Sequence, residues 1–459
     1  MATEKRKSLH GQWSSRLTFI LAVSGSAVGL GNIWKFPYIA GENGGGAFVI
    51  IYLLCVFAIG LPIMMSEVLI GRRGRRNPIT TMKIVGEEEA GQGWWQIVGI
   101  SGVAAGIIIL SFYSVVAGWS LAYVVKSASG AFVGIDSAGV GEVFGGLTGN
   151  WKVLMVWHSV FMFMTLFIVA RGVQRGLEQA VRVLMPALLV LLVVLFIYAA
   201  TEGAFRQGAE FMFAADFSRL TGESWLVALG HAFFTLSLGM GAVMAYGAYL
   251  PEGTSIFGTS VAVVFADTLI ALLAGMVIFP IVFAHGLEAG QGPGLIFQTL
   301  PLAFGQMTGG VIFATLFFVL LSFAAWTSSI GLIEPAVAWL SERFQMARPQ
   351  AAWLVGGVTW LLGVGSVLSF NLLADLKIWR PGKEPGTIFG FMDHLASNIM
   401  LPLGGLLISV FAGWIMCRNS TAEELDLGTG VLYLGWRFLA RIVAPVMVLL
   451  IFLRGVDLL

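Results

Sequence analysis

Long apolar segments recur along almost the whole chain, and they restrict its possible folds more than any other feature. A helix of roughly 20 apolar residues crosses the hydrocarbon core of a bilayer, and about eleven segments meet that criterion. They are 14–38, 46–70, 95–126, 152–171, 177–200, 225–250, 255–284, 308–340, 351–370, 388–416 and 435–455. The composition agrees, because 58% of the residues are hydrophobic and only 11% are charged. We therefore expect an all-α polytopic membrane protein.

The sequence contains no linker or low-complexity tail, so residues 1–459 are expected to form a single membrane domain. Its longest polar connections are 71–94, 127–151, 201–224 and 371–387. We expect these connections to cap the helix bundle. The segment at 285–306 is expected to be a re-entrant or surface helix.

Positively charged side chains gather in alternate loops, and this pattern predicts the orientation of the chain. They are Lys5, Arg6, Lys7, Arg72, Arg73, Arg75, Arg76, Arg171, Arg175, Arg343 and Arg348. Because cationic loops stay in the cytoplasm, the N-terminus is expected to be cytoplasmic. The N-terminal segment lacks the cleavage site of a secretion signal. We expect a multi-pass protein of the plasma (inner) membrane, and the net charge of +1 indicates no nucleic-acid partner.

Glycine and polar residues interrupt two of the apolar segments. The first segment contains GSAVGLGNIWKF at 25–36, and the sixth contains FFTLSLGMGA at 233–242. Interrupted helices at matching positions of two halves are typical of secondary transporters built from inverted repeats. The two repeats would span 14–200 and 225–416, followed by an extra helix at 435–455.

Close helix packing is the alternative explanation for these glycines, because small residues commonly lie where membrane helices approach each other. We expect that role for Gly102 and Gly106. The two interrupted segments differ, since Asn32, Thr235 and Ser237 accompany their glycines. Unwound backbone is tolerated in hydrocarbon only where it is buried in protein or lines a cavity, so these segments are expected to form a binding site.

No pattern in the sequence indicates catalysis, and we do not expect an enzyme. The histidines lack metal-ligand spacing, GLGN lacks the βαβ context of a dinucleotide site, and no P-loop is present. The ionisable residues within apolar segments are Glu67, His231, Asp267, Glu334 and Asp393. Such groups usually face the protein interior, a partner or an ion path. For Glu67, hydrogen-bonded packing and a functional role both remain open.

An unwound membrane helix exposes N–H groups that attract a carboxylate and carbonyls that attract a cation or an ammonium group. A zwitterionic amino acid carries both groups. Contacts made only by oxygen atoms suit a hard cation such as sodium.

The sequence resembles the neurotransmitter:sodium symporter family, and in particular its bacterial amino-acid transporters. The resemblance runs from Trp13 to the last span. Its motifs are WSSRLTFILAVSGSAVGLGNIWKFPYIAGENGGGAF, FFTLSLGMGA and AAWTSSIGLIEP. It implies sodium-driven symport by alternating access in a fold of two inverted five-helix repeats with unwound first and sixth helices.

The resemblance also implies two sodium sites. The second site would use Gly25, Val28, Ala324, Thr327 and Ser328. The first site would use Ala27, Asn32, Thr235 and Asp267, and the substrate carboxylate would complete it. A shift of one residue in the alignment would replace Asp267 by Ala266. Sodium and substrate that share a site bind better together than apart, which gives coupling.

Asp267 bears on chloride dependence. Relatives commonly have asparagine at this position, and chloride-dependent relatives have a serine one turn later, where this chain has Ala271. We expect Asp267 to supply the negative charge that chloride supplies elsewhere, so that transport is independent of chloride.

The resemblance implies a substrate pocket formed by eleven residues. It contains Ala27, Leu30, Gly31, Ile109, Tyr113, Phe234, Thr235, Ser237, Met240, Ser328 and Leu332. Tyr113 is expected to hydrogen-bond the substrate carboxylate. Gly29 stands where monoamine carriers have aspartate, which favours an α-amino acid. Met240 replaces a phenylalanine of some relatives, so we expect a hydrophobic or aromatic substrate; a small aliphatic substrate is the alternative.

The resemblance also implies an outer gate and an inner latch, which close the two sides of the carrier. Lys35 and Asp393 match the outer gate, and lysine in place of the usual arginine is expected to loosen it. Trp13 and Glu342 match the inner latch, but His10 stands where arginine is usual. Its possible replacements are Lys5, Arg6, Lys7 and Arg16.

Gly176 and Pro186 enclose nine residues at the start of the fifth span. In relatives this spacing marks a helix that unwinds and releases the second sodium inward. A proline-kinked helix is the alternative.

We expect the small-molecule amino acid, sodium ions and the lipid bilayer to be the partners of this chain, with no obligate protein partner. A carrier of an osmolyte or another amino-acid-like molecule, and a sensor that does not transport, are the alternative functions. A channel is a further possibility, distinguished by currents far above carrier rates.

Overall fold

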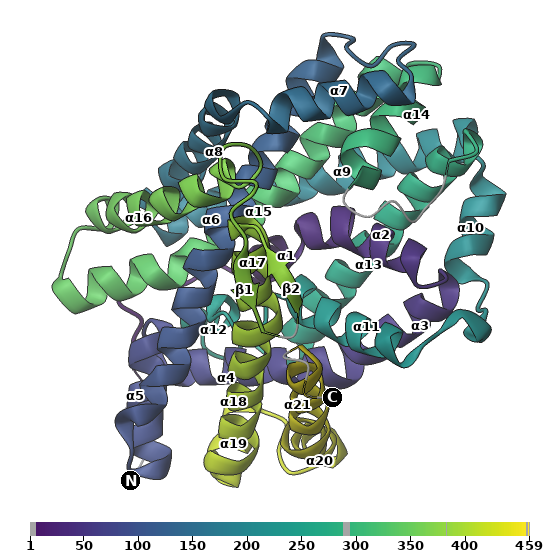
Figure 1. Ribbon diagram of the computed structural model, residues 1–459. Coiled ribbons are helices and arrows are strands. Elements are labelled where there is room, and N and C mark those ends of the chain that lie inside the picture. The colour runs from purple at the N-terminus through teal and green to yellow at the C-terminus, as the bar shows by residue number, and fades with distance from the viewer. Residues whose placement is uncertain (1–5, 288–293, 382, 456–457, 459) are drawn as a thin grey trace.

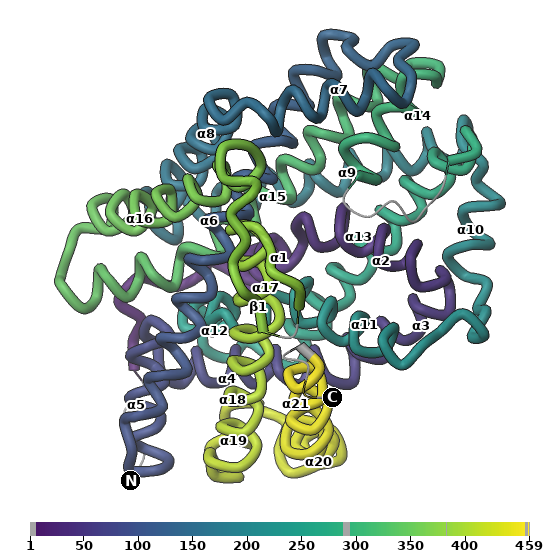
Figure 2. The backbone as a smooth tube through the Cα atoms, viewed as in Figure 1, coloured from purple at the N-terminus to yellow at the C-terminus, as the bar shows by residue number. Residues whose placement is uncertain are grey.

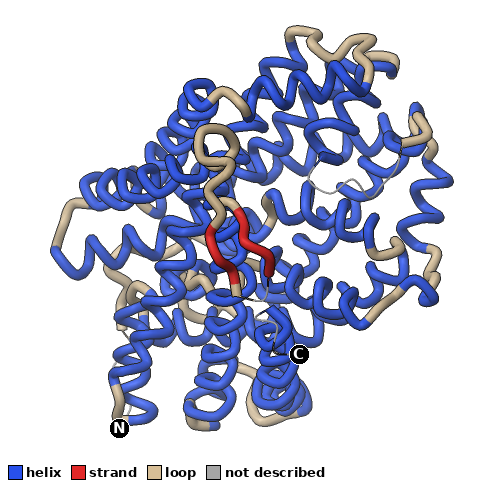
Figure 3. The backbone as a smooth tube through the Cα atoms, in the orientation of Figure 1, coloured by secondary structure: helices blue, strands red, loops and turns tan. Residues whose placement is uncertain are grey.

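The computed structural model describes residues 6–287, 294–381, 383–455 and 458, which form a bundle of helices (Figure 1). The described part contains one sheet, an antiparallel hairpin of β1 (Ile378–Arg380) and β2 (Lys383–Gly386), drawn red in Figure 3. This hairpin lies within the polar connection 371–387.

Nine helices among the described residues are long and apolar enough to cross a membrane. They are Gly46–Gly74, Gly93–Ala128, Trp151–Ala170, Val173–Glu202, Ile256–Ala284, Gly310–Phe344, Arg348–Leu368, Ile388–Ile415 and Val431–Arg454. A tenth span consists of Arg16–Ala27 and Gly31–Glu42, which are bent by 52° at the break between them. The prediction of an all-α polytopic membrane protein is confirmed.

The individual helices of the spans, in chain order, alternate with short π-helical turns (η). They are α1 (Arg16–Ala27), η1 (Gly31–Lys35), α2 (Phe36–Glu42), α3 (Gly46–Cys55), η2 (Val56–Gly60), α4 (Leu61–Gly74), α6 (Gln96–Ala128), α8 (Trp151–Ala170), η4 (Val173–Glu178), α9 (Gln179–Glu202), α11 (Gly222–Thr235), α12 (Ala242–Ala248), α13 (Ile256–Ala284), α15 (Gly310–Phe344), α16 (Arg348–Leu368), α17 (Ile388–His394), η7 (Leu395–Met400), α18 (Leu401–Val410), η8 (Phe411–Ile415), α20 (Val431–Phe438), η9 (Leu439–Val443) and α21 (Ala444–Gly455).

The sixth span, at 225–250, is interrupted, as its glycine-rich motif predicts. It consists of α11 and α12, separated by residues 236–241. Ser237, Gly239 and Gly241 have positive φ angles of 54°, 82° and 75°, which an α-helix cannot contain. Because glycine adopts such angles without steric cost, the glycines of this motif explain where the helix stops.

The polar connections contain helices of their own. They are α5 (Pro78–Ala90), the 3₁₀ turn η3 (Gly93–Trp95), α7 (Ser137–Thr148), α10 (Phe205–Phe213), the 3₁₀ turn η5 (Phe217–Arg219), the π-helical turn η6 (Leu295–Thr299), α14 (Leu300–Gln306) and α19 (Arg418–Leu425). In Figure 1, α7 and α14 lie together at the top, while α5 and α19 lie at the bottom. The expected helix at 285–306 corresponds to η6 and α14, and residues 288–293 of it lie outside the described part.

The helices α6 and α15 pack along each other through the middle of the bundle. A Cβ atom on Gly106 would lie 2.7 Å from the carbonyl oxygen of Leu332, so only glycine permits this approach. A Cβ on Gly102 would lie 3.1 Å from the carbonyl oxygen of Gly239. Both contacts agree with the packing role expected for these two glycines.

Candidate functional site

The first span loses its helical conformation after Ala27, and Figure 2 shows the purple chain passing from α1 through this bend to α2. Val28 has a ψ angle of 105° and ends α1. The carbonyl groups of Gly25 and Val28 accept hydrogen bonds from the Ser328 hydroxyl of α15, at 3.3 and 3.0 Å. The break therefore directs backbone oxygens toward α15.

The other residues expected at the second sodium site lie beside this contact. The Thr327 hydroxyl donates to the carbonyl of Ala324 at 3.1 Å. A Cβ atom on Gly25 would lie 3.3 Å from Cβ of Thr327 and 3.2 Å from Sδ of Met185. The chemistry of this group, carbonyl and hydroxyl oxygens in a buried setting, fits a hard cation. Met185 was not predicted here, and its only signal in the sequence is its place directly before Pro186.

A second polar group joins the first, sixth and seventh spans. The Asn32 amide nitrogen donates to Asp267 Oδ1 at 2.8 Å and to the Asp267 carbonyl at 3.1 Å. The Thr235 hydroxyl donates to Asp267 Oδ2 at 3.1 Å. Asn32, Thr235 and Asp267 have no exposed surface. The side chain that meets Asn32 and Thr235 is thus that of Asp267, and not that of Ala266.

The carboxylate of Asp267 is buried within the membrane-spanning bundle. Among the described residues, no lysine, arginine or histidine lies within ion-pair distance of Asp267. A buried charge normally has a partner of opposite sign, so the oxygen atoms of Asp267, Asn32 and Thr235 fit a cation. Ala27 lies nearby in the wall of the adjoining cavity.

A cavity of about 20 Å³ lies between the two helix breaks. It is lined by Ser26, Ala27, Gly29, Leu30, Gly31, Ile109, Tyr113, Phe234, Ser237, Met240, Ser328 and Leu332. All residues expected in the substrate pocket line this cavity except Thr235, which contacts Asp267 instead. Ser26 and Gly29 were not included in that pocket, and their place inside the first glycine-rich motif is the signal that could have added them.

Two backbone features shape the cavity. A Cβ atom on Gly29 would lie 2.5 Å from the Ser328 hydroxyl oxygen and 2.8 Å from that of Tyr113, so no side chain fits there. Ser237 has a positive φ angle, and its hydroxyl donates to the carbonyl of Ser26 at 3.0 Å. This hydrogen bond joins the break in the sixth span to the break in the first span.

Tyr113 faces the break directly. Its hydroxyl oxygen accepts a hydrogen bond from the Leu30 amide at 3.2 Å. The hydroxyl hydrogen remains available to donate to a ligand in the cavity. This geometry suits the carboxylate contact expected of Tyr113.

The outer-gate residues line a second cavity, of about 120 Å³, next to Tyr113 and Phe234. The Lys35 ammonium nitrogen lies 4.4 Å from the centroid of the Phe234 ring, in a cation–π contact. Asp393 accepts a hydrogen bond from the Ser397 hydroxyl at 3.0 Å. Lys35 and Asp393 thus face one cavity without forming an ion pair in this conformation.

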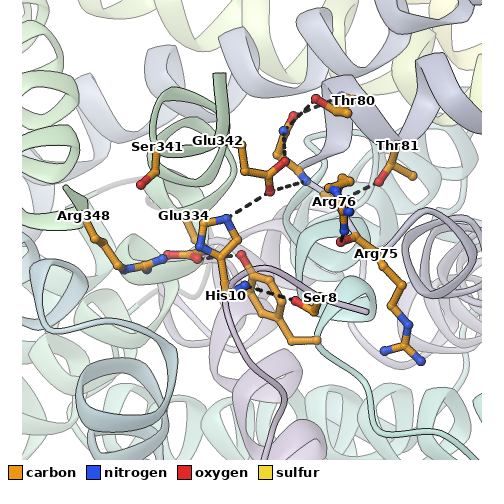
Figure 4. Close-up of polar contacts among 12 residues, drawn as sticks. Ser8, His10, Arg75, Arg76, Thr80, Thr81, Glu334, Ser341, Glu342 and Arg348 are labelled. Atoms are coloured by element: carbon orange, nitrogen blue, oxygen red, sulfur yellow. Dashed lines mark hydrogen bonds and ion pairs between the residues drawn. The ribbon is translucent and has the colours of Figure 1, made fainter. Parts of the chain in front are cut away.

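His10 and Glu342 of the inner latch are in contact, as Figure 4 shows. His10 Nε2 donates to Glu342 Oε1 at 3.0 Å. The backbone and side-chain amides of Asn77 donate to the same carboxylate, at 2.9 and 2.6 Å. Trp13 is buried, and its indole donates to the carbonyl of Tyr246 at 3.2 Å. Asn77 was not predicted, and its position after the arginine-rich loop gives no sign of this contact.

Arg16, one of the cations considered as replacements for His10, has its guanidinium group beside Gly258. Arg6 pairs with Glu88, and the backbone carbonyl of Lys7 accepts a hydrogen bond from Arg76. Lys5 lies outside the described residues. The expected contact at Glu342 is therefore made by the histidine.

Two further carboxylates within the spans, those of Glu67 and Glu334, have hydrogen-bond or ion-pair partners. Glu67 accepts a hydrogen bond from the Gly239 amide at 2.7 Å, so it stabilises the break in the sixth span. Glu334 accepts from the Tyr249 hydroxyl at 2.9 Å and forms an ion pair with Arg348, near the latch in Figure 4. In the sequence, Arg348 was one of several positively charged loop residues, and nothing indicated its ion pair with Glu334.

His231 is enclosed by aromatic rings. It is buried between Phe36 and Tyr52, with ring centroids 5.9 and 5.4 Å away. It also borders a cavity of about 260 Å³ that Lys35 and Phe234 line as well. His231 therefore lies on the same side of the break in the sixth span as Lys35.

Comparisons with known proteins agree with this arrangement. The sequence model of the sodium:neurotransmitter symporter family matches residues 10–133 and 142–458. A sodium-dependent transporter of Bacillus subtilis is 38% identical over 98% of this chain and 98% of its own length. One of Haemophilus influenzae is 34% identical over 96% and 97%.

A solved structure gives the same result for the fold. The crystal structure of MhsT in complex with L-phenylalanine has a TM-score of 0.89 and 42% identity, over 97% of this chain and 99% of that one. The family consists of transporters and not of enzymes, and its bacterial members here are named as sodium-dependent. This chain belongs to the sodium:neurotransmitter symporter family and is a multi-pass, sodium-dependent membrane transporter.

Proposed function

We propose that this protein couples the inward movement of sodium to the uptake of an α-amino acid. The observation that carries the proposal is the contact of Asn32 and Thr235 with Asp267, beside the cavity between the helix breaks. A cation held by these oxygens would lie next to any carboxylate in the cavity. Each would then strengthen the binding of the other, which is the thermodynamic requirement for symport.

Two sodium sites are proposed. The first consists of Ala27, Asn32, Thr235 and Asp267, completed by the substrate carboxylate. The second consists of Gly25, Val28, Ala324, Thr327 and Ser328. The buried oxygen atoms of both groups support this assignment, because hard cations prefer such ligands.

Transport is proposed to be independent of chloride. Asp267 already places a carboxylate at the first site, and Ala271, one turn later, is buried and offers no donor to an anion. The fixed charge would balance sodium without a second ion. Replacement of chloride by gluconate should leave uptake unchanged, and a strict requirement for chloride would refute this part of the proposal.

The substrate is proposed to be a hydrophobic or aromatic amino acid. Gly29 leaves no side-chain carboxylate to meet an amine, and Tyr113 can donate to a substrate carboxylate. The flexible side chain of Met240 lies in the cavity wall and can yield to a large apolar group. The related MhsT was crystallised with L-phenylalanine, which supports this size class.

Alternating access is proposed to occur between inverted repeats at 14–200 and 225–416. With the N-terminus in the cytoplasm of a plasma membrane, the latch of Trp13, His10 and Glu342 would be the inner gate. The latch contacts are made, while Lys35 and Asp393 remain apart. Contacts at the inner latch, together with separated outer-gate residues, correspond to a carrier that is closed to the cytoplasm.

Two other functions keep the same pocket. A carrier of an osmolyte would bind a different zwitterion, and a sensor would bind an amino acid without moving it. Competition of a panel of amino acids against one bound radioligand separates the substrates. Sodium-driven accumulation in proteoliposomes separates transport from sensing.

A further inference from the structure

Three polar side chains lie at four-residue intervals at the start of the fifth span. Gln174 and Glu178 belong to η4, and Arg182 belongs to the first turns of α9. Side chains with this spacing lie on one helix face. The Gln174 amide donates to the carbonyl of Gln12 at 3.0 Å, and Arg182 donates to the Ser14 hydroxyl at 2.6 Å. This face therefore holds the segment that leads into α1.

Glu178 makes the central contact on this face. Its carboxylate accepts from the Ser14 amide at 3.1 Å and from the Ser14 hydroxyl at 2.5 Å. Arg182 pairs with the same carboxylate at 2.6 Å. Only 5% of Glu178 is exposed, whereas the Arg182 side chain is 52% exposed. A nearly buried carboxylate thus joins the backbone just before α1 to the fifth span.

The same helix leads to the second sodium site. Three residues after Arg182, Met185 lies against Gly25, a residue of that site. The fifth span therefore contacts the N-terminal segment of the first span at Ser14 and the sodium site at Gly25.

We propose that Glu178 is a positioning residue that couples the start of α1 to the start of the fifth span, so that both segments open together on the cytoplasmic side. The functional consequence rests on the proposed sodium symport, because opening of both segments would expose the second sodium site. The contacts that carry the coupling involve neither sodium nor substrate. Without the carboxylate, the Ser14 amide and Arg182 lose a charged partner, and each segment can open alone.

Hydrogen exchange measured by mass spectrometry in nanodiscs tests the coupling. Glu178→Gln is compared with wild type and with Glu202→Gln, a matched change at the exposed far end of α9. Loss of a hydrogen-bonded charge is expected to increase exchange about tenfold or more in both 12–24 and 173–186. Glu202→Gln is expected to match wild type in both segments. Faster exchange in only one segment, or in neither, would overturn the proposal.

Two further variants allow the same test if Glu178→Gln does not fold. If Glu178→Gln does not elute as a monodisperse protein, Ser14→Ala and Arg182→Gln each remove part of the same group of contacts and leave the Glu178 carboxylate in place. Each is expected to accelerate exchange in both segments by a smaller factor, and an effect confined to one segment contradicts the coupling.

A transport readout separates this inference from the proposed function. The half-saturating sodium concentration for uptake is expected to rise about tenfold in Glu178→Gln and to stay unchanged in Glu202→Gln. An unchanged sodium dependence in Glu178→Gln would contradict the functional part of the inference. If wild type shows no sodium-driven uptake, the proposed function fails, while the exchange result still decides the coupling.

Discussion

The side-chain amide of Asn32 donates a hydrogen bond to the Asp267 carboxylate at 2.8 Å, within a fully buried group that includes Thr235. These three residues come from the first, sixth and seventh spans. The first and sixth spans are the ones interrupted by glycine. The breaks therefore serve to bring polar groups of distant segments together at one carboxylate, next to a cavity.

Replacement of Asp267 by asparagine should reduce sodium-driven uptake in chloride and in gluconate alike. The variant keeps the size of the side chain and its ability to hydrogen-bond, but it removes the negative charge that balances sodium. Because Ala271 offers no donor to hold a chloride ion in its place, uptake is expected to fall about tenfold or more in both salts. Uptake in chloride and in gluconate is measured at several sodium concentrations. Asp216→Asn, in an exposed loop, serves as the control. Wild-type uptake by Asp267→Asn in gluconate would contradict the role given to this carboxylate.

A methyl group on Gly29 should abolish substrate binding. Gly29→Ala would place Cβ 2.5 Å from the Ser328 hydroxyl, a distance that forces the site to shift. We expect uptake to fall at least about tenfold with little loss of folded protein, since overpacking one site costs only a few kcal/mol. Gly357→Ala, which meets no atom within 4 Å, is the matched control. Full activity of Gly29→Ala would show that the break accommodates a side chain.

Removal of the Tyr113 hydroxyl should weaken substrate binding more than it weakens the fold. Tyr113→Phe loses the acceptor of the Leu30 amide and the donor proposed for the substrate carboxylate. A hydrogen bond to a charged group contributes about 1.5–3 kcal/mol, so the KM should rise about tenfold or more. Tyr198→Phe, whose hydroxyl donates to the carbonyl of Thr308 away from the site, provides the comparison. Equal KM values for the two variants would argue against the carboxylate contact.

A larger and stiffer side chain at Met240 should shift the preference toward small substrates. Met240→Phe would fill part of the cavity, so the KM for phenylalanine should rise about tenfold relative to that for alanine. Met155→Phe, on the partly buried α8, tests the general effect of the substitution. If phenylalanine and alanine respond equally, Met240 packs without selecting the substrate.

The arrangement of the spans could be predicted from the sequence, because long apolar segments and glycine-rich interruptions are local features. Asp267 and Asn32 were also within reach, since ionisable and polar residues are rare in membrane segments and usually functional. The residues at which the two halves of the sixth span end and begin could not be predicted. Its division into α11 and α12 depends on positive φ angles at Ser237 and Gly239 that a hydropathy pattern does not specify.

Contacts between distant segments could not be predicted, because they depend on packing. Lys35 lies over the ring of Phe234, although its family position suggested a pair with Asp393. Glu178 looks like an ordinary helix-terminal carboxylate until Ser14 is placed beside it. In each case the side chain was visible in the sequence, and its partner was not.

The most direct test of the central claim is uptake of radiolabelled L-phenylalanine by proteoliposomes that contain the purified protein and start free of sodium. An inward sodium gradient should drive accumulation well above the equilibrium level, and an equal potassium gradient should not. Binding without accumulation, or equal uptake in both salts, would contradict sodium-coupled amino-acid transport.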